Sequence, residues 1–394
     1  MEGKGCRIVT VKEVHSLFKG DEQANAIELA SLEEVGNCIV VLKGLYQSGD
    51  KALFVEPDYC LPDTDLFKEY ICPGGDPKKC RLGSKNRVRA IKFNLHTGDG
   101  NPVYSYGVMV PSSQVEAFAK VKLNDLSIDW DKEIGIVKWE EPETFSDGGG
   151  KVVTSEFPQG MYKTDEENIN NLVNDIQFPV FLIGTEKIDG GSLTIWYKNG
   201  QSGICSRKQG RPLTYNKIVG YRKPNFFHQF LTKLTKGRYR YDGRIIQLAE
   251  SDDKFVVIGK PYLELLTNYC RKNGRNLALR SELVGKGNKG SGNPKNPKAK
   301  EESHIELFGV DDYTKNTVRL DYNEARRIAD ELGIPYVKEY FQKTFETKED
   351  IFETCQKIFD AEKETGRIIE GIVLRNPSGN FSMKLMNMFY DSTK

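Results

Sequence analysis

A short glycine turn in the middle of the sequence carries a lysine and an aspartate between two apolar runs. The turn is Lys187-Ile188-Asp189-Gly190, with residues 179–183 before it and 193–197 after it. This pattern is typical of one strand entering a tight turn and a second strand leaving it. Glycine lets backbone approach a ligand closely, and sheet backbone can hold the lysine amine against a phosphate. The stretch therefore predicts a phosphate-facing lysine where two strands meet.

The chain length indicates two domains. A chain of 394 residues is long enough for two units that each bury a core. No run approaches the roughly 20 apolar residues that span a bilayer, and the N-terminus lacks the apolar segment of a signal peptide. We expect a soluble, intracellular, monomeric protein that makes no membrane contact.

The eight cysteines are scattered, with no CxxC pair and no histidine at zinc-finger spacing. We expect free thiols. A metal site built from Cys60, Cys72 and Cys80 is the alternative.

Basic residues are concentrated in one block. Residues 201–300 hold 22 Lys and Arg against 6 Asp and Glu, and the rest of the chain holds 35 against 50. Aromatic residues are interleaved with basic ones at 221–228 and 238–241. Charge beside stacking rings is what single-stranded nucleic acid requires. A solvated basic face, with the rings partly in the core, is the alternative.

The first half of the chain reads as β structure. Strand-like runs lie at 7–14, 38–42, 52–55, 88–93 and 103–110, which indicates a small β-barrel of the OB type. A small sandwich fits nearly as well. Residues 61–85 read as a surface loop. Residues 141–156 have linker composition, so we expect domains at 1–150 and 157–394.

The second half alternates between helices and strands, as in a mixed α/β domain, so the whole chain is predicted to be α+β. Residues 286–300, rich in Lys, Gly, Asn and Pro, read as a mobile loop. The predicted helices are 165–176, 255–271, 322–332 and 348–365, and the predicted strands are 277–284, 305–310, 369–374 and 381–386.

Five stretches in this order resemble the motifs of the covalent nucleotidyltransferase superfamily, which includes RNA ligases, DNA ligases and mRNA capping enzymes. They are Lys187 to Gly190, Ser281 to Gly285, Ile305 to Phe308, Glu370 to Arg375 and Ser382 to Lys384. Residues 40–62 and 87–92 are similar to the N-terminal domain of the Naegleria-type RNA ligases, the fifth RNA ligase family, and residues 157–166 to the bridge that follows it. The resemblance implies an N-terminal OB-like barrel followed by an ATP-grasp-like ligase domain.

The same resemblance implies ATP-dependent RNA ligation with Lys187 as the nucleophile. Lysine has a pKa of about 10.4, so its surroundings must disfavour the cation before it can attack the α-phosphorus of ATP. AMP would then pass to the 5′-phosphate of an RNA, and a 3′-hydroxyl would displace it, in nicked or otherwise base-paired RNA. Charge develops on phosphate oxygens at each step, which explains a need for cationic side chains and for Mg²⁺ or Mn²⁺.

The remaining site residues follow from the resemblance. Glu186 is expected to contact the adenine amino group, and Phe308 to stack on the adenine ring. Arg207 is expected near the ribose, and Glu282 at the ribose or at metal-bound waters. Lys384 is expected to bind the α-phosphate. Asp189 and Glu370 would hold metal waters, which suits the strong hydration of Mg²⁺. Glu306 has the same strand parity as Phe308, so it could face the pocket as a further metal-water contact.

Each of these residues also has a plainer interpretation. Asp189 could be a turn residue, the glutamates surface carboxylates, and Phe308 a core residue. Two positions depart from the family pattern. Lys384 is followed by Leu385-Met386 where a second lysine is common, leaving Arg375 to assist, and Asn168 stands where the bridge often has an arginine that contacts pyrophosphate.

Three other functions compete with RNA ligation. DNA ligases and capping guanylyltransferases usually carry an OB domain after the last motif, whereas this sequence ends ten residues after Lys384. We therefore expect RNA ligation. A non-catalytic nucleic-acid-binding protein is disfavoured by the intact lysine motif and its acidic partners.

Overall fold

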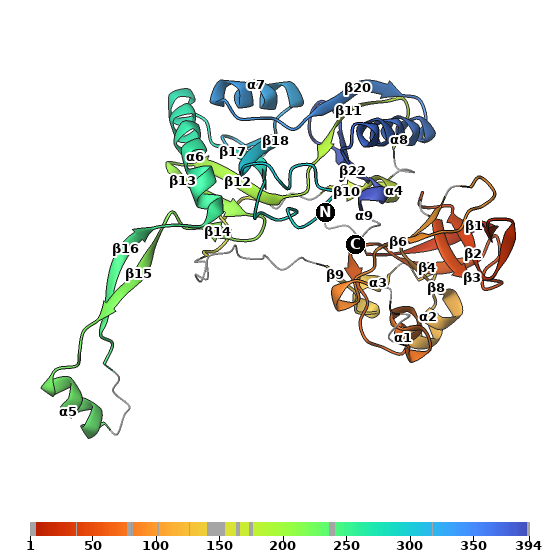
Figure 1. The fold of residues 1–394 in the computed structure, drawn as a ribbon, viewed down its shortest axis with the longest axis horizontal. Helices are drawn as coiled ribbons and strands as arrows, with labels where there is room; N and C mark the ends of the chain where they lie inside the picture. The colour runs from red at the N-terminus through yellow and green to blue at the C-terminus, as the bar shows by residue number, and fades with distance from the viewer. Residues whose placement is uncertain are drawn as a thin grey trace.

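The computed structural model describes residues 5–36, 38–76, 80, 82–100, 102–125, 127–139, 154–162, 166–172, 176–235, 241–316 and 318–391. Figure 1 shows three parts: a curled β unit from the first third of the chain, a body of two sheets, and a long arm that projects from the body. The predicted linker at 141–156 lies almost wholly outside the described residues.

The N-terminal unit is a curled sheet in the order β3-β2-β1-β4-β8. The strand β1 pairs with β4 through its first half and with β2 through its second, with two register shifts in the second half. One face encloses a core that includes Val9, Phe54 and Met109. The strands are β1 Cys6–Lys19, β2 Glu22–Leu32, β3 Cys38–Leu42, β4 Lys51–Val55 and β8 Val108–Pro111.

Smaller elements complete this unit. Two short ladders, β5 Tyr59–Cys60 with β9 Val137–Lys138 and β6 Ala90–Phe93 with β7 Val103–Tyr106, lie beside the curled sheet. The helices are α1 Lys68–Ile71, η1 Pro73–Gly75, η3 Ser84–Asn86, α2 Ser112–Ala119 and α3 Trp130–Glu133. No ladder closes the curled sheet into a barrel among the strands that the structure describes, so the OB-type barrel stays a prediction.

The first sheet of the body has the order β10-β22-β21-β11-β20, and α8 packs on one face of it. Leu182, Phe345 and Ile351 are fully buried in the core between helix and sheet. The elements are β10 Glu167–Asn168, β11 Val180–Lys187, β20 Glu339–Phe345, β21 Gly371–Arg375, β22 Ser382–Met386, α4 Ile169–Leu172, α8 Lys348–Glu364 and α9 Met388–Asp391.

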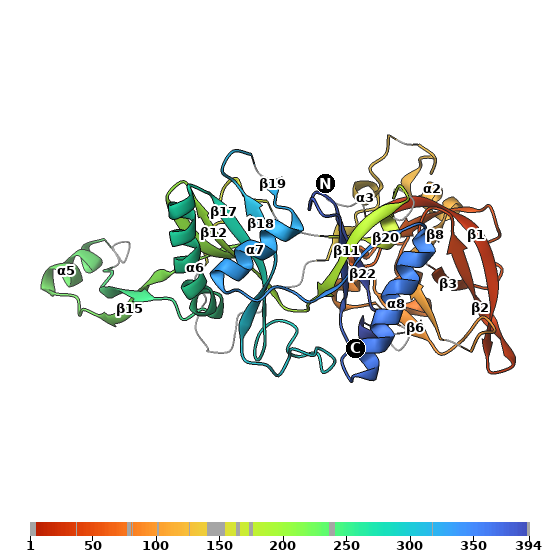
Figure 2. The same cartoon turned by 90° about the horizontal axis from the view of Figure 1, so that it is seen from above.

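The second sheet has the order β14-β13-β12-β17-β18-β19 and is covered by α6 and α7 (Figures 1 and 2). Asp253 and Asp321 cap the two helix N-termini, and Gly274 and Gly333 end them in the left-handed conformation. The elements are β12 Gly191–Lys198, β13 Gln201–Ser206, β14 Gly210–Arg211, β17 Leu277–Val284, β18 His304–Asp312, β19 Val318–Arg319, α6 Lys254–Asn273 and α7 Tyr322–Leu332.

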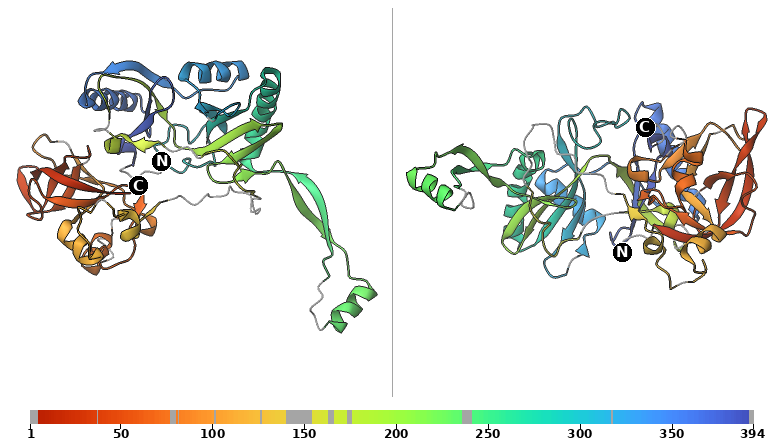
Figure 3. Two further views of the ribbon diagram at one scale, coloured as in Figure 1. Left: turned by 180° about the vertical axis from the view of Figure 1, so that it is seen from behind. Right: turned by 90° about the horizontal axis from the view of Figure 1, so that it is seen from below.

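The arm is a two-stranded ribbon with a helix near its tip. The ribbon pairs β15 Thr214–Tyr221 with β16 Arg244–Glu250, and the helix is α5 Phe226–Leu234. Figure 3 shows from two sides that the ribbon and its helix extend away from both sheets.

The predicted α+β class and most predicted elements of the body are confirmed, with β17 and α7 at the predicted bounds. The helix predicted at 165–176 is wrong at Glu167–Asn168, which pair as a strand with β22. The free-thiol prediction is wrong for Cys72 and Cys80, which form a disulfide. Among the described residues, no helix is long and apolar enough to cross a membrane.

Candidate active site

The lysine turn is the covalent crossing between the two sheets of the body. The strand β11 ends at Lys187 in one sheet and β12 begins at Gly191 in the other. A Cβ atom on Gly190 would lie 2.6 Å from the carbonyl oxygen of Leu283 and 2.8 Å from Cγ of Glu282. Such distances are shorter than any ordinary contact, so only glycine lets the turn pack against β17 at Glu282.

The amine of Lys187 lies among carboxylates. Its Nζ is 2.6 Å from Oε2 of Glu370, and both side chains are mostly buried. Burial alone would lower the pKa of Lys187, but the charges of Glu370, Asp189 and Glu282 outweigh it and raise that pKa above its usual value. The structure thus brings together four of the predicted site residues, with the lysine held as an ammonium ion.

Glu282 lies in a row of side chains across the six-stranded sheet. It is directly opposite Ser192 on one side and Glu306 on the other. Burial, with smaller contributions from Glu370 and Asp189, raises the pKa of Glu282 to about 8, although Lys289 and Lys187 oppose the shift. Burial therefore favours the neutral acid form of Glu282 in this structure.

Asp189 is held from two directions by residues that sequence reasoning missed. The hydroxyl of Tyr390 in α9 donates to Oδ2 of Asp189 at 2.6 Å. Asn296 donates from Nδ2 to the Asp189 carbonyl oxygen at 2.9 Å and is 7% exposed. Residues 286–300, predicted to be a mobile loop, therefore form hydrogen-bonded turns against the site. Only the Asn-rich composition of this stretch could have hinted at such turns.

Glu186 lies on the other face of β11 from Lys187, since neighbouring strand residues alternate. Its carboxylate accepts hydrogen bonds from Arg367 at 3.1 and 3.3 Å and from Tyr340 at 3.4 Å. Burial raises the pKa of Glu186, against the lowering effect of Arg367. The structure therefore does not bring the Glu186 carboxylate into the cluster around Lys187.

Glu306 is buried and already neutralised. It forms an ion pair with Lys298 and lies 3.2 Å from Nε2 of His304. Within the described ranges, no group of three or more His, Cys, Asp or Glu side chains is placed to hold a metal ion. Metal contacts through water therefore stay a prediction.

Phe308 occupies a β-bulge. A bulge interrupts the alternation of side chains along the strand, so Glu306 can no longer be placed on the same face as Phe308 by counting residues. Arg280 pairs with Gly309 while the next residue, Ser281, pairs with Leu307, so Phe308 is the extra residue. Its carbonyl oxygen accepts hydrogen bonds from the hydroxyl of Tyr336 at 3.0 Å and from Arg375. Arg375 belongs to β21 in the other sheet, so its hydrogen bond to Phe308 links the two sheets. In this arrangement the Arg375 side chain is engaged by Phe308 and is not free to bind a phosphate.

Lys384 faces the same side of its sheet as Lys187. Thr185, Val373 and Lys384 form one cross-strand row, and Lys187 follows Thr185 by two residues. Asn168 pairs with Lys384 through the backbone and donates from Nδ2 to the Tyr106 hydroxyl at 3.3 Å.

A hollow of about 130 Å³ lies where the N-terminal unit meets the body, and Lys384 and Asn168 line it together with Arg87 and Arg89 of the N-terminal unit. Arg87 is hydrogen-bonded to Asp58. The N-terminal unit therefore supplies cationic side chains next to Lys384.

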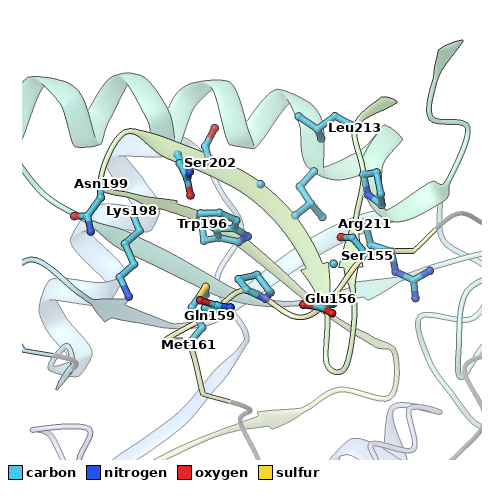
Figure 4. Close-up of a pocket in the computed structure, with 16 residues that line it drawn as sticks. Ser155, Glu156, Gln159, Met161, Trp196, Lys198, Asn199, Ser202, Arg211 and Leu213 are labelled. Atoms are coloured by element: carbon cyan, nitrogen blue, oxygen red, sulfur yellow. The ribbon is translucent and has the colours of Figure 1, made fainter. Parts of the chain in front are cut away.

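Arg207 lies in the exposed turn between β13 and β14, closed by the Ser206 N–H donating to the carbonyl oxygen of Gln209. A second hollow, of about 560 Å³, lies between this edge of the sheet and residues 155–161 (Figure 4). Trp196, Lys198 and Arg211 line it, but none of the predicted site residues does. The reactive groups gather at the junction of the sheets instead.

Comparisons with known proteins agree with this geometry. The family model described as RNA ligase matches residues 181–386, more than half of the chain. No curated protein matches the chain significantly.

Solved structures of Naegleria gruberi RNA ligase share the fold. A lysine-substituted variant with AMP and Mn is 21% identical, with 98% of each chain covered and a TM-score of 0.67. The same ligase with pyrophosphate is 20% identical, with 98% of each chain covered and a TM-score of 0.68. A variant with ATP and Mn is 20% identical over 98% of each chain, with a TM-score of 0.66. Because the RNA ligase family model matches more than half of the chain, this chain belongs to the RNA ligase family.

Proposed function

We propose that this protein is an ATP-dependent RNA ligase that joins RNA ends through a lysyl–AMP intermediate at Lys187. The observation that carries the proposal is the amine of Lys187, 2.6 Å from Glu370 and within the field of Asp189 and Glu282, at the junction of two sheets. The Naegleria gruberi structures that share this fold include complexes with ATP or AMP and Mn, which supports the choice of ATP and a divalent cation.

The proposed chemistry has three balanced steps. The Lys187 amine, after losing a proton, bonds to the α-phosphorus of ATP while pyrophosphate leaves. The 5′-phosphate of an RNA then takes the AMP and regenerates the amine. Finally a 3′-hydroxyl attacks the activated 5′-phosphate, which releases AMP and seals the strand.

Carboxylates near Lys187 are proposed to hold a divalent cation through water, because no three of the described side chains are placed to ligate one directly. Three acidic side chains, those of Glu370, Asp189 and Glu282, act on one ammonium group and raise its pKa. We propose that Asp189 and Glu370, with Glu306 as a weaker candidate, hold such an ion through water. When bound, the ion would supply positive charge that favours the neutral amine. Glu370 would then release its ion pair, and Lys187 could turn toward the nucleotide.

The other side chains receive roles according to where they lie. We propose that Phe308 stacks on the adenine, Glu282 contacts the ribose or metal waters, Lys384 binds the α-phosphate and Arg207 approaches the ribose from its exposed turn. Glu186 can contact the adenine amino group only by giving up its hydrogen bonds to Arg367.

We also propose that the N-terminal unit is of the OB type, with the domain boundary between residues 150 and 157. The curled sheet and its enclosed core support this assignment. The protein is proposed to act inside the cell as a monomer.

Covalent labelling tests the proposal. Incubation of the protein with radiolabelled ATP and Mg²⁺ should attach label to the protein, and Lys187→Ala should abolish it. As a matched control, Lys198→Ala changes an amine at the far end of β12 and should keep the label. Label from GTP but not ATP would favour capping, and no label from either would favour a binding protein.

Strand sealing separates RNA ligation from DNA ligation. The protein should join a 5′-phosphate RNA to a 3′-hydroxyl RNA end on a complementary strand. Equal sealing of nicks in all-DNA duplexes would contradict the RNA preference.

A further inference from the structure

The arm exposes large apolar and aromatic side chains that nothing in the described chain covers. Phe226 is 84% exposed, Tyr221 72% and Phe227 63%. Along the ribbon, Ile218 and Ile246 are opposite each other and both exposed. An isolated two-stranded ribbon is marginally stable in water, and exposed rings gathered at one end mark an interaction site. The arm therefore needs a partner.

The charge of the arm specifies the kind of partner. Residues 214–250 contain eight Lys and Arg but only two acidic residues. Those two acids are already paired: Asp242 with Arg244 at 2.6 Å, and Glu250 with Lys260 of the body at 3.0 Å. Across the part of the chain that the structure describes, Lys217, Arg222, Lys223 and Lys233 form no ion pair with a carboxylate. A second copy of the arm would meet this surface with the same charge, so the charge opposes self-association.

Cations and rings occur together at the outer end. Arg222 and Lys223 lie three to four residues before the start of α5, whose first turn presents Phe226 and Phe227. The ring of His228 lies 4.2 Å from that of Tyr241. Nucleic-acid bases stack on exposed aromatic rings while their phosphates contact Lys and Arg. The aliphatic residues of the ribbon are compatible with the apolar faces of unstacked bases.

We propose that the arm binds a single-stranded segment of the RNA substrate, outside the site that joins the ends. Two strands of this length reach roughly 25 Å from the body, so the arm would hold RNA at a distance from Lys187. This inference rests on the proposed function, since it assigns a surface to the substrate of the same enzyme.

The base of the arm allows a clean test. Thr214 pairs with Glu250, and the N–H of Ser251 donates to the carbonyl oxygen of Leu213 at 2.9 Å, so the two ends of the arm are neighbours. Residues 215–249 can therefore be replaced by a short Gly-Ser turn without stretching the body. A second variant, Arg222→Ala, Lys223→Ala, Phe226→Ala and Phe227→Ala, removes the charges and rings but keeps the ribbon.

Both variants should form lysyl–AMP from ATP within about twofold of wild type, whereas affinity for a labelled single-stranded RNA should fall at least about tenfold. Sealing at low RNA concentration should fall in parallel. The slope of log affinity against log salt should shrink by about 1.4 for the fourfold variant, which loses two cations. The matched control, with Lys12→Ala, Lys272→Ala and Phe118→Ala, alters exposed residues elsewhere and should leave affinity and slope unchanged.

The proposal would be overturned if the fourfold variant kept the RNA affinity, the salt slope and the sealing rate of the wild type. The arm would then be assigned to a protein partner. If the excised protein does not fold, the fourfold variant decides by the same criteria. A wild-type protein that takes no label from ATP would contradict the proposed function instead. Loss of RNA binding in the fourfold variant would still assign the arm to RNA in that event.

Discussion

Position 190 requires glycine because there is no room for a side chain there. The turn passes so close to β17 that a methyl group would meet the Leu283 carbonyl oxygen and Cγ of Glu282. The absence of a side chain at Gly190 therefore sets how closely Lys187 can approach the carboxylate of Glu282 in the neighbouring sheet.

Gly190→Ala should reduce lysyl–AMP formation at least about a hundredfold, because displacement of the turn by an ångström can cost that much. Far-UV circular dichroism should remain close to wild type. The control is Gly292→Ala in the adjacent loop, where an added Cβ meets nothing within 4 Å. Equal labelling of the two variants would show that the turn has room to move.

Glu362 shows how a buried carboxylate near the site contributes to stability. It accepts a hydrogen bond from Arg367 at 2.9 Å, pairs with Lys338 and is 7% exposed. Burial alone would raise its pKa, but Lys338, Arg367 and Tyr340 together lower the pKa of Glu362 below its ordinary value. A lowered folded-state pKa gives stability that is present above the unfolded value of about 4.3 and is lost as pH falls through the folded value.

Glu362→Gln should therefore lower the free energy of unfolding by about 1–2 kcal/mol at pH 7, a reduced figure because both cationic partners are partly exposed. The difference from wild type should narrow as the pH falls below about 4. Urea unfolding at pH 7 and at pH 3.5 measures both values. Glu364→Gln, an exposed change two residues away, should have little effect, and a difference independent of pH would contradict the ion-pair explanation.

At the level of elements, the sequence predicted those helices and strands whose ends are set by residues close to them in the chain. The helix α7 has its predicted bounds, and the residues that fix them are local: Asp321 caps its N-terminus and Gly333 ends it in the left-handed conformation. The strand β10 was missed because Glu167 and Asn168 form a strand only by pairing with β22, more than 200 residues later. The disulfide of Cys72 and Cys80 likewise depends on spatial proximity.

The candidate site divides in the same way. The motifs predicted that Lys187, Asp189, Glu282 and Glu370 gather, and the structure brings them together. They did not predict Tyr390 or Asn296, because a hydrogen bond from a remote polar side chain leaves no period or spacing in the sequence. The bulge at Phe308 is also invisible to a parity argument, which assumes an unbroken ladder.

The turns formed by residues 286–300 should contribute to the chemistry by holding Asp189. Asn296 donates to the carbonyl oxygens of Asp189 and Gly290, at 2.9 and 3.2 Å. Asn296→Ala leaves these acceptors unpaired, so lysyl–AMP formation should fall about tenfold or more. Lys300→Ala, an exposed change in the same segment, serves as the control. Wild-type labelling rates in the Asn296 variant would show that the loop is not needed to hold Asp189.

At the scale of the whole molecule, the N-terminal unit contributes cationic side chains to the hollow that Lys384 lines. Asn168 occupies the position where the family often has an arginine, and the hollow beside it is lined by Arg89 from the N-terminal unit. A cation from another part of the chain therefore stands next to Lys384 and Asn168.

Arg89→Ala should raise the KM for ATP about tenfold, the size expected for one lost charge-assisted hydrogen bond, with a smaller effect of Arg89→Lys. Initial rates of label incorporation at several ATP concentrations measure this. Lys12→Ala, an exposed cation elsewhere in the N-terminal unit, should leave KM unchanged. An unaltered KM in the Arg89 variants would confine nucleotide binding to the body.

The crossing of the chain at Lys187 has a consequence for how this protein fails. The amine and Glu370 belong to the sheet covered by α8, whereas Glu282 belongs to the sheet covered by α6 and α7, and each sheet has its own core. Reactivity thus requires the two cores to be docked, not merely folded. In mild denaturant, lysyl–AMP formation should be lost before either sheet unfolds. Covalent labelling by ATP should therefore detect separation of the two sheets at lower denaturant concentrations than circular dichroism detects loss of secondary structure.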